Sequence, residues 1–295
     1  MAADGARVLV VGDVIDDVIV TPETAIRADT DTSARIERRA GGSAANVAAW
    51  LGHLGAEVDF VGTVGADDDF RHTELLSQYG VTAMIAGSTR AATGTIIVIV
   101  DGERRTMLTD RGANLLTGPD SVPDLTPYRH LHLTGYSVFT GSDDAGWQAV
   151  ISRAHDAGAT VSVDTSSAGY LADFGVDRFL DIIDGTDLLL PNWDEARVLV
   201  GRKDQADCTA ALAERFGLVV LTSGSAGVWV GDAGAVTMVP AQPATLVDAT
   251  GAGDAFAAAF LSRWISIPDP IAAAEFAARI AAGAISTAGA RPGLW

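Results

Sequence analysis

The segment Asp248-Ala-Thr-Gly-Ala-Gly-Asp254 leads directly into Ala255-Phe-Ala-Ala-Ala-Phe-Leu-Ser-Arg-Trp264, so that a glycine-containing loop becomes an apolar helix. Gly251 and Gly253 allow a tight turn that brings backbone N–H groups close to a ligand. The first turn of a helix has unpaired N–H donors and the positive end of the helix dipole. The segment therefore predicts an anion site formed by the amides of Gly251, Ala252 and Gly253.

Asp254 lies directly beside this predicted anion site. A carboxylate does not bind an anion, but next to a bound phosphoryl group it can remove a proton from a hydroxyl group. Asp254 is therefore a candidate catalytic base. For the segment taken alone, the alternative is an aspartate that only caps a buried helix.

Composition indicates a single globular domain over residues 1–295, with 48% hydrophobic and 20% charged residues. No apolar run approaches the roughly 20 residues that span a bilayer, and no secretory signal is expected. Cys208 is the only cysteine, which excludes a disulfide within the chain and suits the cytoplasm. A net charge of -18 argues against nucleic acid as a partner. We therefore expect a cytoplasmic protein that binds neither nucleic acid nor membrane.

Lys203 is the only lysine, and it lies in Gly-Arg-Lys-Asp. The residues around Lys203 match neither the Walker A phosphate loop nor the strand that carries the lysine of protein kinases. Most Schiff-base sites also need a lysine for which this sequence has no candidate. A protein of this sequence that handles phosphate must use backbone amides, arginines and a metal ion.

Short apolar segments alternate with helical segments along the chain. This pattern predicts a doubly wound, mainly parallel α/β sheet whose ligands bind at the carboxyl ends of the strands. Polar side chains, among them Asp13, Asp164 and Asn192, follow several of these strands. A helix is expected to about residue 53, and two Ala-rich helices around residues 271–287. The expected strands are Val8–Val11, Val58–Val64, His130–Thr134, Thr160–Asp164, Asp187–Leu190 and Leu218–Thr222.

A predicted β-hairpin interrupts this alternation. Two apolar segments, Thr95–Val100 and Glu103–Thr109, flank Asp101-Gly102, a strong hairpin signal. Together with residues 14–39, residues 94–112 predict a small β-sheet lid beside the main sheet. The exposed edges of such a lid would allow pairing in a homodimer.

Two glycine-rich motifs and two further motifs carry a resemblance to a known family. Asp248 to Leu261 matches its signature except at Ala249, where the family has Thr, Ser, Pro or Val. The other motifs are Gly41-Gly42-Ser-Ala-Ala-Asn46 with Gly55 and Gly65, Pro191-Asn192-Trp-Asp-Glu195, and Leu221-Thr222-Ser-Gly224-Ser-Ala-Gly227. With these motifs in order, the chain resembles the ribokinase-like (PfkB) carbohydrate kinases.

This resemblance implies an ATP-dependent kinase acting on the hydroxymethyl group of a sugar or polyol. It implies a Rossmann-like domain with a β-sheet lid, Asp254 as the base, and an anion hole formed by the amides of Gly251, Ala252 and Gly253. The positions that match substrate-binding residues of the family are Asp13, Asp17, Gly41, Gly42 and Asn46.

The resemblance also assigns positions to the nucleotide and to cations. Asn192 and Glu195 match the motif that organises Mg²⁺ and its waters, although the same pair fits a helix capping box. Asp248 and Thr250 lie in the loop that binds a monovalent cation such as K⁺ in several relatives. The positions beside the nucleotide are Thr222, Gly224 and Gly227.

The pattern Asp-x-Asn-x-Arg, common in hexose kinases of the family, is reduced here to Asp164-Thr-Ser166-Ser-Ala168. This departure weakens any assignment to fructose or ketogluconate. A nucleoside kinase of the same fold is the main alternative. A non-catalytic sugar sensor is disfavoured because Asp254 is retained. A nicotinamide dehydrogenase is disfavoured because the glycine motif lies near the C-terminus and position 256 is Phe.

Seven further residues have ordinary structural explanations. His130 and His132 could bind a metal from one face of a strand, but a structural role is favoured. Arg105 and Arg111 are expected to be solvated charges of the lid, and Tyr136 is either a substrate wall or a core residue. Asp16 and Asp17 could be no more than exposed lid acids.

Overall fold

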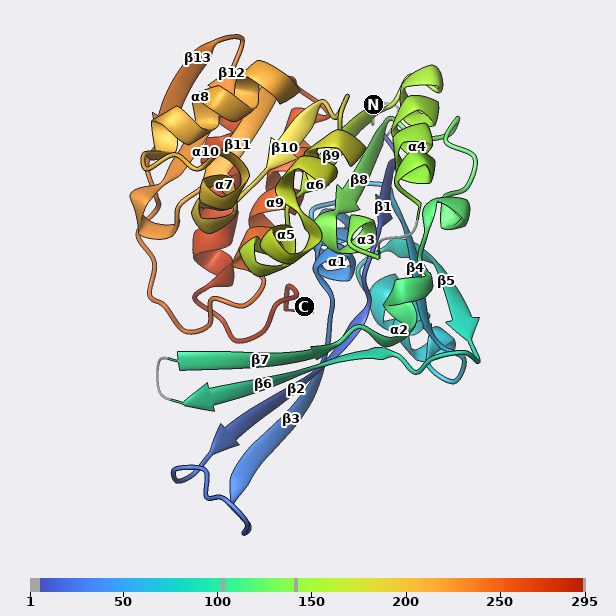
Figure 1. Cartoon of the computed structure of the whole chain (residues 1–295), viewed down its shortest axis with the longest axis vertical. Coiled ribbons are helices and arrows are strands. Elements are labelled where there is room, and N and C mark those ends of the chain that lie inside the picture. The colour runs from blue at the N-terminus through green and yellow to red at the C-terminus, as the bar shows by residue number, and fades with distance from the viewer. Residues whose placement is uncertain (1–5, 102–103, 141–142, 294–295) are drawn as a thin grey trace.

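A computed structural model of the chain describes residues 6–101, 104–140 and 143–293. Its main sheet has nine strands in the order β13-β12-β11-β10-β9-β8-β1-β4-β5, and β12 and β13 are antiparallel to their neighbours at one edge. The mainly parallel sheet is confirmed (Figure 1). The strands are β1 Val8–Val11, β4 Val58–Gly65, β5 Val81–Ser88, β8 His130–Thr134, β9 Thr160–Asp164, β10 Leu188–Leu190, β11 Leu218–Thr222, β12 Val228–Asp232 and β13 Ala235–Val239.

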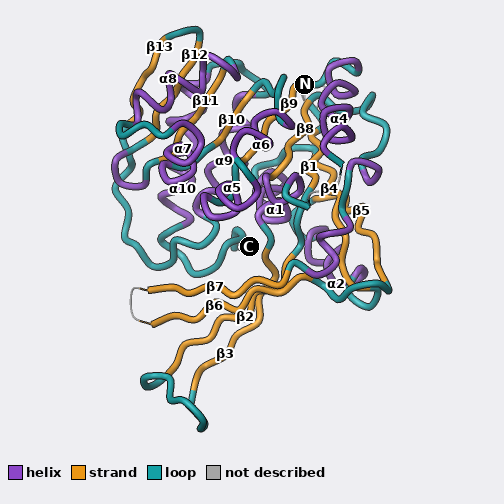
Figure 2. Tube along the Cα trace, viewed as in Figure 1, coloured by secondary structure: helices purple, strands orange, loops and turns teal. Residues whose placement is uncertain are grey.

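Helices cover both faces of this sheet (Figure 2). Alternation along β1 sends Val8 and Val10 into one hydrophobic cluster, with α1, α9 and α10, and sends Leu9 and Val11 into a second cluster on the opposite face. The helices are α1 Ser43–His53, α2 Asp69–Ser77, α3 Gly135–Val138, α4 Asp144–Asp156, α5 Ala168–Phe174, α6 Val176–Ile182, α7 Trp193–Val200, α8 Gln205–Phe216, α9 Ala252–Trp264 and α10 Pro270–Ala284.

A second sheet of four strands, in the order β3-β2-β6-β7, extends away from the main body (Figure 1). Its strands are β2 Ile15–Pro22, β3 Ala34–Gly41, β6 Gly94–Asp101 and β7 Arg104–Asp110. The two segments expected to form a lid therefore pair with each other, and β6 and β7 are antiparallel as the hairpin signal predicted. Gly102 and Glu103 of the predicted turn lie outside the described residues.

The structure corrects the expectation of two Ala-rich helices at residues 271–287, where one helix, α10, runs from Pro270 to Ala284. Asp269 caps it by accepting a hydrogen bond from the Ala272 amide, and Pro270 occupies its first turn, where proline favours a helix. Several alanines of α10 are buried in the same hydrophobic cluster as α9, against which this helix packs. None of the helices in the described part of the chain is both long and apolar enough to cross a bilayer.

Candidate active site

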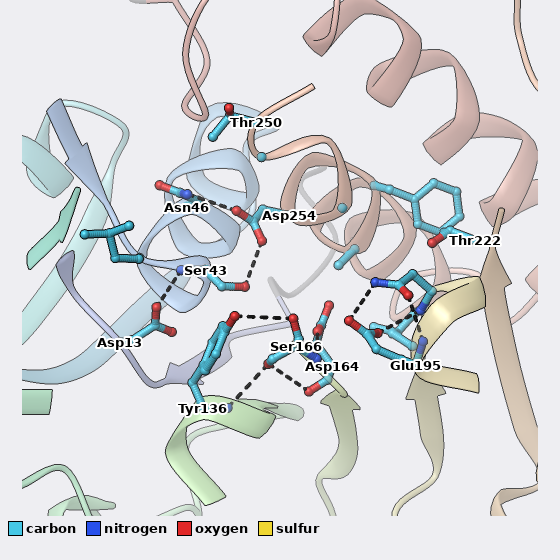
Figure 3. A pocket seen from close by; sticks show the side chains of 18 of the residues that line it. Asp13, Ser43, Asn46, Tyr136, Asp164, Ser166, Glu195, Thr222, Thr250 and Asp254 are labelled. Carbon is cyan, nitrogen blue, oxygen red and sulfur yellow. Dashed lines mark hydrogen bonds between the residues drawn. The ribbon is translucent and has the colours of Figure 1, made fainter. Parts of the chain in front are cut away.

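The carboxyl ends of the central strands, the first turns of α1 and α9, and the inner face of the lid surround a cleft of about 280 Å³ (Figure 3). The lid contributes Asp17 from β2 and three apolar side chains, Ile96, Val98 and Met107. The cleft therefore lies where a doubly wound sheet is expected to bind its ligand.

The first turn of α1 is fixed by the loop that follows β1. Gly42 has a φ of 95°, and a Cβ there would collide with the carbonyl group of Asp13, so only glycine fits. The Asp13 carboxylate accepts hydrogen bonds from the amides of Ser43, at 2.8 Å, and Ala44, at 3.2 Å. Asp13 thus lines the cleft while its carboxylate anchors the start of α1.

Asp254 points into the cleft from the first turn of α9 (Figure 3). Its carboxylate accepts hydrogen bonds from Ser43 Oγ, at 2.8 Å, and from Asn46 Nδ2, at 2.9 Å. The capping alternative is wrong, because Gly251 is the N-cap of α9 and no side chain caps this helix. Burial raises the pKa of Asp254 to about 7, and the two hydrogen bonds oppose part of this shift. A carboxylate with such a pKa is well suited to act as a base near neutral pH.

The backbone at the start of α9 differs between the two glycines beside Asp254. Gly251 has a φ of 74°, and a Cβ there would lie 2.6 Å from the Cα atom of Ala290. At Gly253, in contrast, a Cβ would meet nothing within 4 Å, so the space above this residue is open. The amide of Ala252 makes a turn bond of 3.3 Å to the Ala249 carbonyl. Gly251 and Gly253 line the cleft, and the positive end of α9 faces it.

Asp17 lines the cleft from the lid and is not a fully exposed acid. Burial, with a smaller contribution from the charge of Asp13, raises the pKa of Asp17 to about 6, while Arg291 acts in the opposite direction. The assignment of Gly41 to the substrate site stays a prediction, and Gly41 lies directly beside Asp17. Its missing Cβ leaves room for the Asp17 carboxylate, and its carbonyl accepts a hydrogen bond from Arg291 at 3.1 Å.

A second group of acids lies at the carboxyl ends of β9 and β10. Glu195 accepts hydrogen bonds from Thr165 Oγ1 at 2.5 Å and from the Asn192 amide at 2.8 Å. Asn192 in turn accepts from the Glu195 amide at 3.0 Å, which confirms the capping box. Burial raises the pKa of Asp164 well above its usual range, and the charge of Glu195 adds to the effect.

These acids fit a magnesium ion. Burial also raises the pKa of Glu195, so two neighbouring carboxyl groups that line one cleft both disfavour their charged forms. A divalent cation between them and a phosphate chain would relieve this cost. No cluster of three or more Asp, Glu, His or Cys side chains in the described residues could hold a metal. Mg²⁺ suits such a site because it keeps waters and binds phosphates alongside one or two carboxylates.

The three residues expected beside a nucleotide come together in an adjoining cavity of about 200 Å³. Thr222, Gly224 and Gly227 line it with small side chains of α10 such as Ala278 and Ala282. Thr222, Gly253 and Phe256 line both this cavity and the main cleft, so the two spaces adjoin beside the start of α9. An apolar space of this kind fits the flat aromatic base of a nucleotide whose phosphate groups extend into the main cleft.

The Asp248 carboxylate braces its own loop. It accepts hydrogen bonds from the amide of Thr250, at 3.0 Å, from Thr250 Oγ1, at 2.7 Å, and from the amide of Gly289, at 3.1 Å. Arg39 Nη1 lies 3.9 Å from the same carboxylate. The assignment of Asp248 and Thr250 to a K⁺ site, which concerns the carbonyl groups of the loop, stays a prediction.

The structure also shows the surroundings of the two histidines and of one arginine. His130 and His132 are buried and share the Ser162 hydroxyl, at 2.7 and 2.8 Å, which supports the structural role. Arg111 is not a solvated lid charge, because its guanidinium lies 5.6 Å from the ring centroid of Tyr136 and 5.8 Å from that of Tyr170. The side chain of Arg105 lies outside the described residues.

Two residues of the site were not predicted. Ser43 belongs to the first glycine-rich motif and opens α1, so its position beside Asp254 had a signal in the sequence. Arg291 lies in the C-terminal segment, where no motif marks it. Its Nε donates a hydrogen bond to Asn46 Oδ1 at 3.0 Å.

Three known proteins that resemble this chain in sequence or fold are kinases. A fructokinase from Klebsiella pneumoniae is 31% identical over 284 residues, which cover 90% of this chain and 88% of the relative. An ATP-dependent ribose-1-phosphate kinase from Halopiger xanaduensis is 32% identical over 294 residues, with 97% and 94% covered. Adenosine kinase from Sinorhizobium meliloti has the same fold, with a TM-score of 0.86 at 23% identity and coverage of 98% and 96%. The family model described as pfkB family carbohydrate kinase matches residues 6–295, and the chain therefore belongs to this family.

Proposed function

We propose that this protein transfers the γ-phosphoryl group of ATP to a hydroxymethyl group on a sugar or sugar-like small molecule. The observation that carries the proposal is the half-buried Asp254 carboxylate, which lines the cleft at the start of α9 and has a pKa raised to about 7. Membership of a carbohydrate kinase family agrees with this chemistry.

In the proposed reaction, the Asp254 carboxylate takes the proton of the attacking hydroxyl group. The hydroxyl oxygen forms a bond to the γ-phosphorus, the bond between that phosphorus and the bridging oxygen of ADP breaks, and ADP leaves with the electron pair. An alcohol is a weak nucleophile at neutral pH, so a base held at hydrogen-bond distance contributes about 10²–10⁴-fold to the rate. Ser43 and Asn46 hold this base in place.

The charge that develops on the transferring group requires fixed positive partners. The amides of Gly251 and Gly253 would supply them at the start of α9, and the Ala252 amide would join them only by giving up its turn bond to the Ala249 carbonyl. Bound Mg²⁺ neutralises phosphate charge, and Asp164 and Glu195 would hold it through its waters. On the substrate side, Asp17 and Asn46 offer hydroxyl-binding groups, with Gly41, Gly42 and Asp13 shaping the pocket around them. The lid would exclude water that could otherwise accept the phosphoryl group.

A nucleoside kinase is the second candidate. The inner face of the lid places Ile96, Val98 and Met107 in the cleft, and such side chains could contact a flat base attached to a ribose. The sugar hydroxyls would then meet Asp17 and Asn46 in the same manner. The two candidates share every proposed catalytic residue and differ only in the substrate.

A substrate panel separates these candidates. ADP formation from ATP and Mg²⁺ is measured with ribose, fructose, inositol, adenosine and pseudouridine, and thermal shifts are recorded with a non-hydrolysable ATP analogue. Turnover of a free sugar or polyol supports the proposal, whereas turnover confined to nucleosides selects the second candidate. Tight binding without turnover of any substrate would indicate a sugar sensor and contradict the enzyme assignment.

We also propose that the lid mediates a homodimer. Strand alternation turns Ile36, Ile97 and Leu108 to the face opposite the cleft, where they are 61%, 38% and 54% exposed. Apolar side chains grouped on an open sheet face are typical of an interface. Sedimentation velocity should show a dimer that Leu108→Asp converts to a monomer, and a wild-type protein that sediments as a monomer at all concentrations contradicts the proposal.

A further inference from the structure

We infer that Arg291 is a positioning residue for the proposed base: its guanidinium holds the side-chain amide of Asn46 so that the NH₂ group faces Asp254. The inference rests on the proposed function of Asp254. Arg291 itself lies outside the four motifs on which the family resemblance was based.

The donor and acceptor chemistry of the three side chains fixes the orientation. An asparagine amide has one end that accepts and one end that donates, whereas a guanidinium only donates and an ionised carboxylate only accepts. Arg291 Nε donates to Asn46 Oδ1 at 3.0 Å, and Asn46 Nδ2 donates to Asp254 Oδ2 at 2.9 Å. With Arg291 in place, a rotated Asn46 amide would set donor against donor at one end and acceptor against acceptor at the other.

The segment that carries Arg291 is itself attached to both glycine-rich motifs. Arg291 Nη2 donates to the Gly41 carbonyl at 3.1 Å, and the indole of Trp50 donates to the Ala290 carbonyl at 2.9 Å. On the other side, the amide of Gly289 donates to the Asp248 carboxylate at 3.1 Å. The C-terminal segment therefore connects the start of α1 to the loop before α9, and Arg291 lies at the point where the two meet.

Arg291 also brings positive charge to an acidic site. Its charge opposes the rise in the pKa of Asp17, and it interacts favourably with Asp254. Burial lowers the pKa of Arg291, but a guanidinium stays charged in proteins. Arg291 lines a neighbouring cavity of about 290 Å³ with Tyr79 and Arg39, whereas Asn46 and Asp254 line the main cleft. This placement suits a group that acts through Asn46 on the base.

Three variants test the inference. Arg291→Met removes both the donor and the charge, Arg291→Lys keeps the charge but loses the planar pair of donors, and Arg279→Met is the control on the exposed part of α10. We expect kcat to fall about 10- to 100-fold in both Arg291 variants, because a small misplacement of a catalytic group has effects of this size. The KM for ATP should stay within about twofold of wild type. The acid limb of the kcat profile should move to higher pH in Arg291→Met and much less in Arg291→Lys. Arg279→Met should match wild type throughout.

A second measurement needs no substrate and therefore separates this inference from the proposed function. The carboxyl carbons of aspartate are labelled with ¹³C, the Asp254 resonance is identified by its loss in Asp254→Asn, and its titration is followed by NMR. We expect Arg291→Met to titrate at higher pH than wild type. An unchanged Asp254 titration overturns the inference even if no substrate is found, and so does an unchanged kcat. A rise in the acceptor KM alone would make Arg291 a substrate ligand and also overturn it. If Arg291→Met does not fold, Arg291→Lys gives the kinetic decision.

Discussion

Asn46 and Asp254 lie 208 positions apart in the chain, yet Asn46 Nδ2 donates a hydrogen bond of 2.9 Å to Asp254 Oδ2. The bond joins the first turns of α1 and α9, which pack against each other in one hydrophobic cluster. Both helices begin at a glycine and present the positive ends of their dipoles to the same cleft. Negative charge that develops beside Asp254 therefore meets two positive helix ends in a site without a lysine among its lining residues.

Asp254→Asn should lower kcat by about 10³-fold, because an amide cannot take a proton from the attacking hydroxyl group. The variant keeps the shape of the side chain, so the affinity for ATP, measured by isothermal titration calorimetry, should change less than twofold. Ser43→Ala removes only one hydrogen bond to the carboxylate and should have a much smaller effect on kcat. Activity of Asp254→Asn within threefold of wild type would remove the assignment of Asp254 as base.

The rate should depend on pH through Asp254. Because its pKa is raised to about 7, kcat/KM should fall about tenfold per unit below pH 7 and be level above it. The pKa of Asp17, raised to about 6, should steepen the fall below pH 6 if Asp17 binds the substrate as a carboxylate. Initial rates between pH 5.5 and 9 at saturating ATP test this. A level profile down to pH 5.5 would contradict it.

The raised pKa of Asp254 also predicts that the ionised form needed for catalysis lowers the stability of the fold. The folded pKa of Asp254 lies above the ordinary value of 3.8, so its contribution to stability is complete below that value and is lost as the pH rises through 7. The ionised base that catalysis requires therefore destabilises the fold. Asp254→Asn should have a higher Tm than wild type at pH 8, and the difference in Tm should be clearly smaller at pH 5. A lower Tm for the variant at pH 8 would contradict this sign.

The sequence predicted those parts of the site that local chemistry determines. The loop from Asp248 to Asp254 has a glycine at the N-cap of α9, with a φ of 74°. A positive φ favours glycine, so the glycine in the sequence indicates this conformation. The same holds for Gly42 and for the capping box of Asn192 and Glu195.

What sequence reasoning missed depends on packing between distant segments. Arg291 has no local pattern and gains its position only when the C-terminal segment lies against α1. Arg111 was expected in solvent because arginines usually are, but two aromatic rings from other elements cover it. The edge strand β5, Val81–Ser88, was not predicted, since exposed polar residues and small side chains weaken its alternating pattern. In each case the deciding partner is remote in the chain.

Gly251 and Gly253 form a matched pair for testing the anion cradle. Gly253→Ala adds a methyl group to open space in the cleft, so it should leave Tm unchanged while lowering kcat at least tenfold by crowding the bound phosphate. Gly251→Ala places a side chain at a φ of 74° and against Ala290, and it should also lower Tm by several degrees. Calorimetry and steady-state kinetics on both variants provide the comparison. Wild-type kcat in Gly253→Ala would show that no anion lies against this backbone.

The buried histidine pair of β8 should make the fold sensitive to acid. Burial lowers the pKa of both His130 and His132 to about 3, so their contribution to stability is full above the unfolded value of 6.5 and declines as the pH falls toward 3. At pH 5, each histidine should lower the free energy of unfolding by roughly 2 kcal/mol. Urea unfolding at pH 7.5 and pH 5 measures this loss. His132→Leu removes one of these groups, including its Nε2 atom, which has no hydrogen-bond partner among the described residues. Ser162 keeps its bond to His130. Between the two pH values, the variant should therefore lose roughly 2 kcal/mol less of its free energy of unfolding than wild type does. An equal loss in both proteins would mean that the buried pair does not set the acid sensitivity.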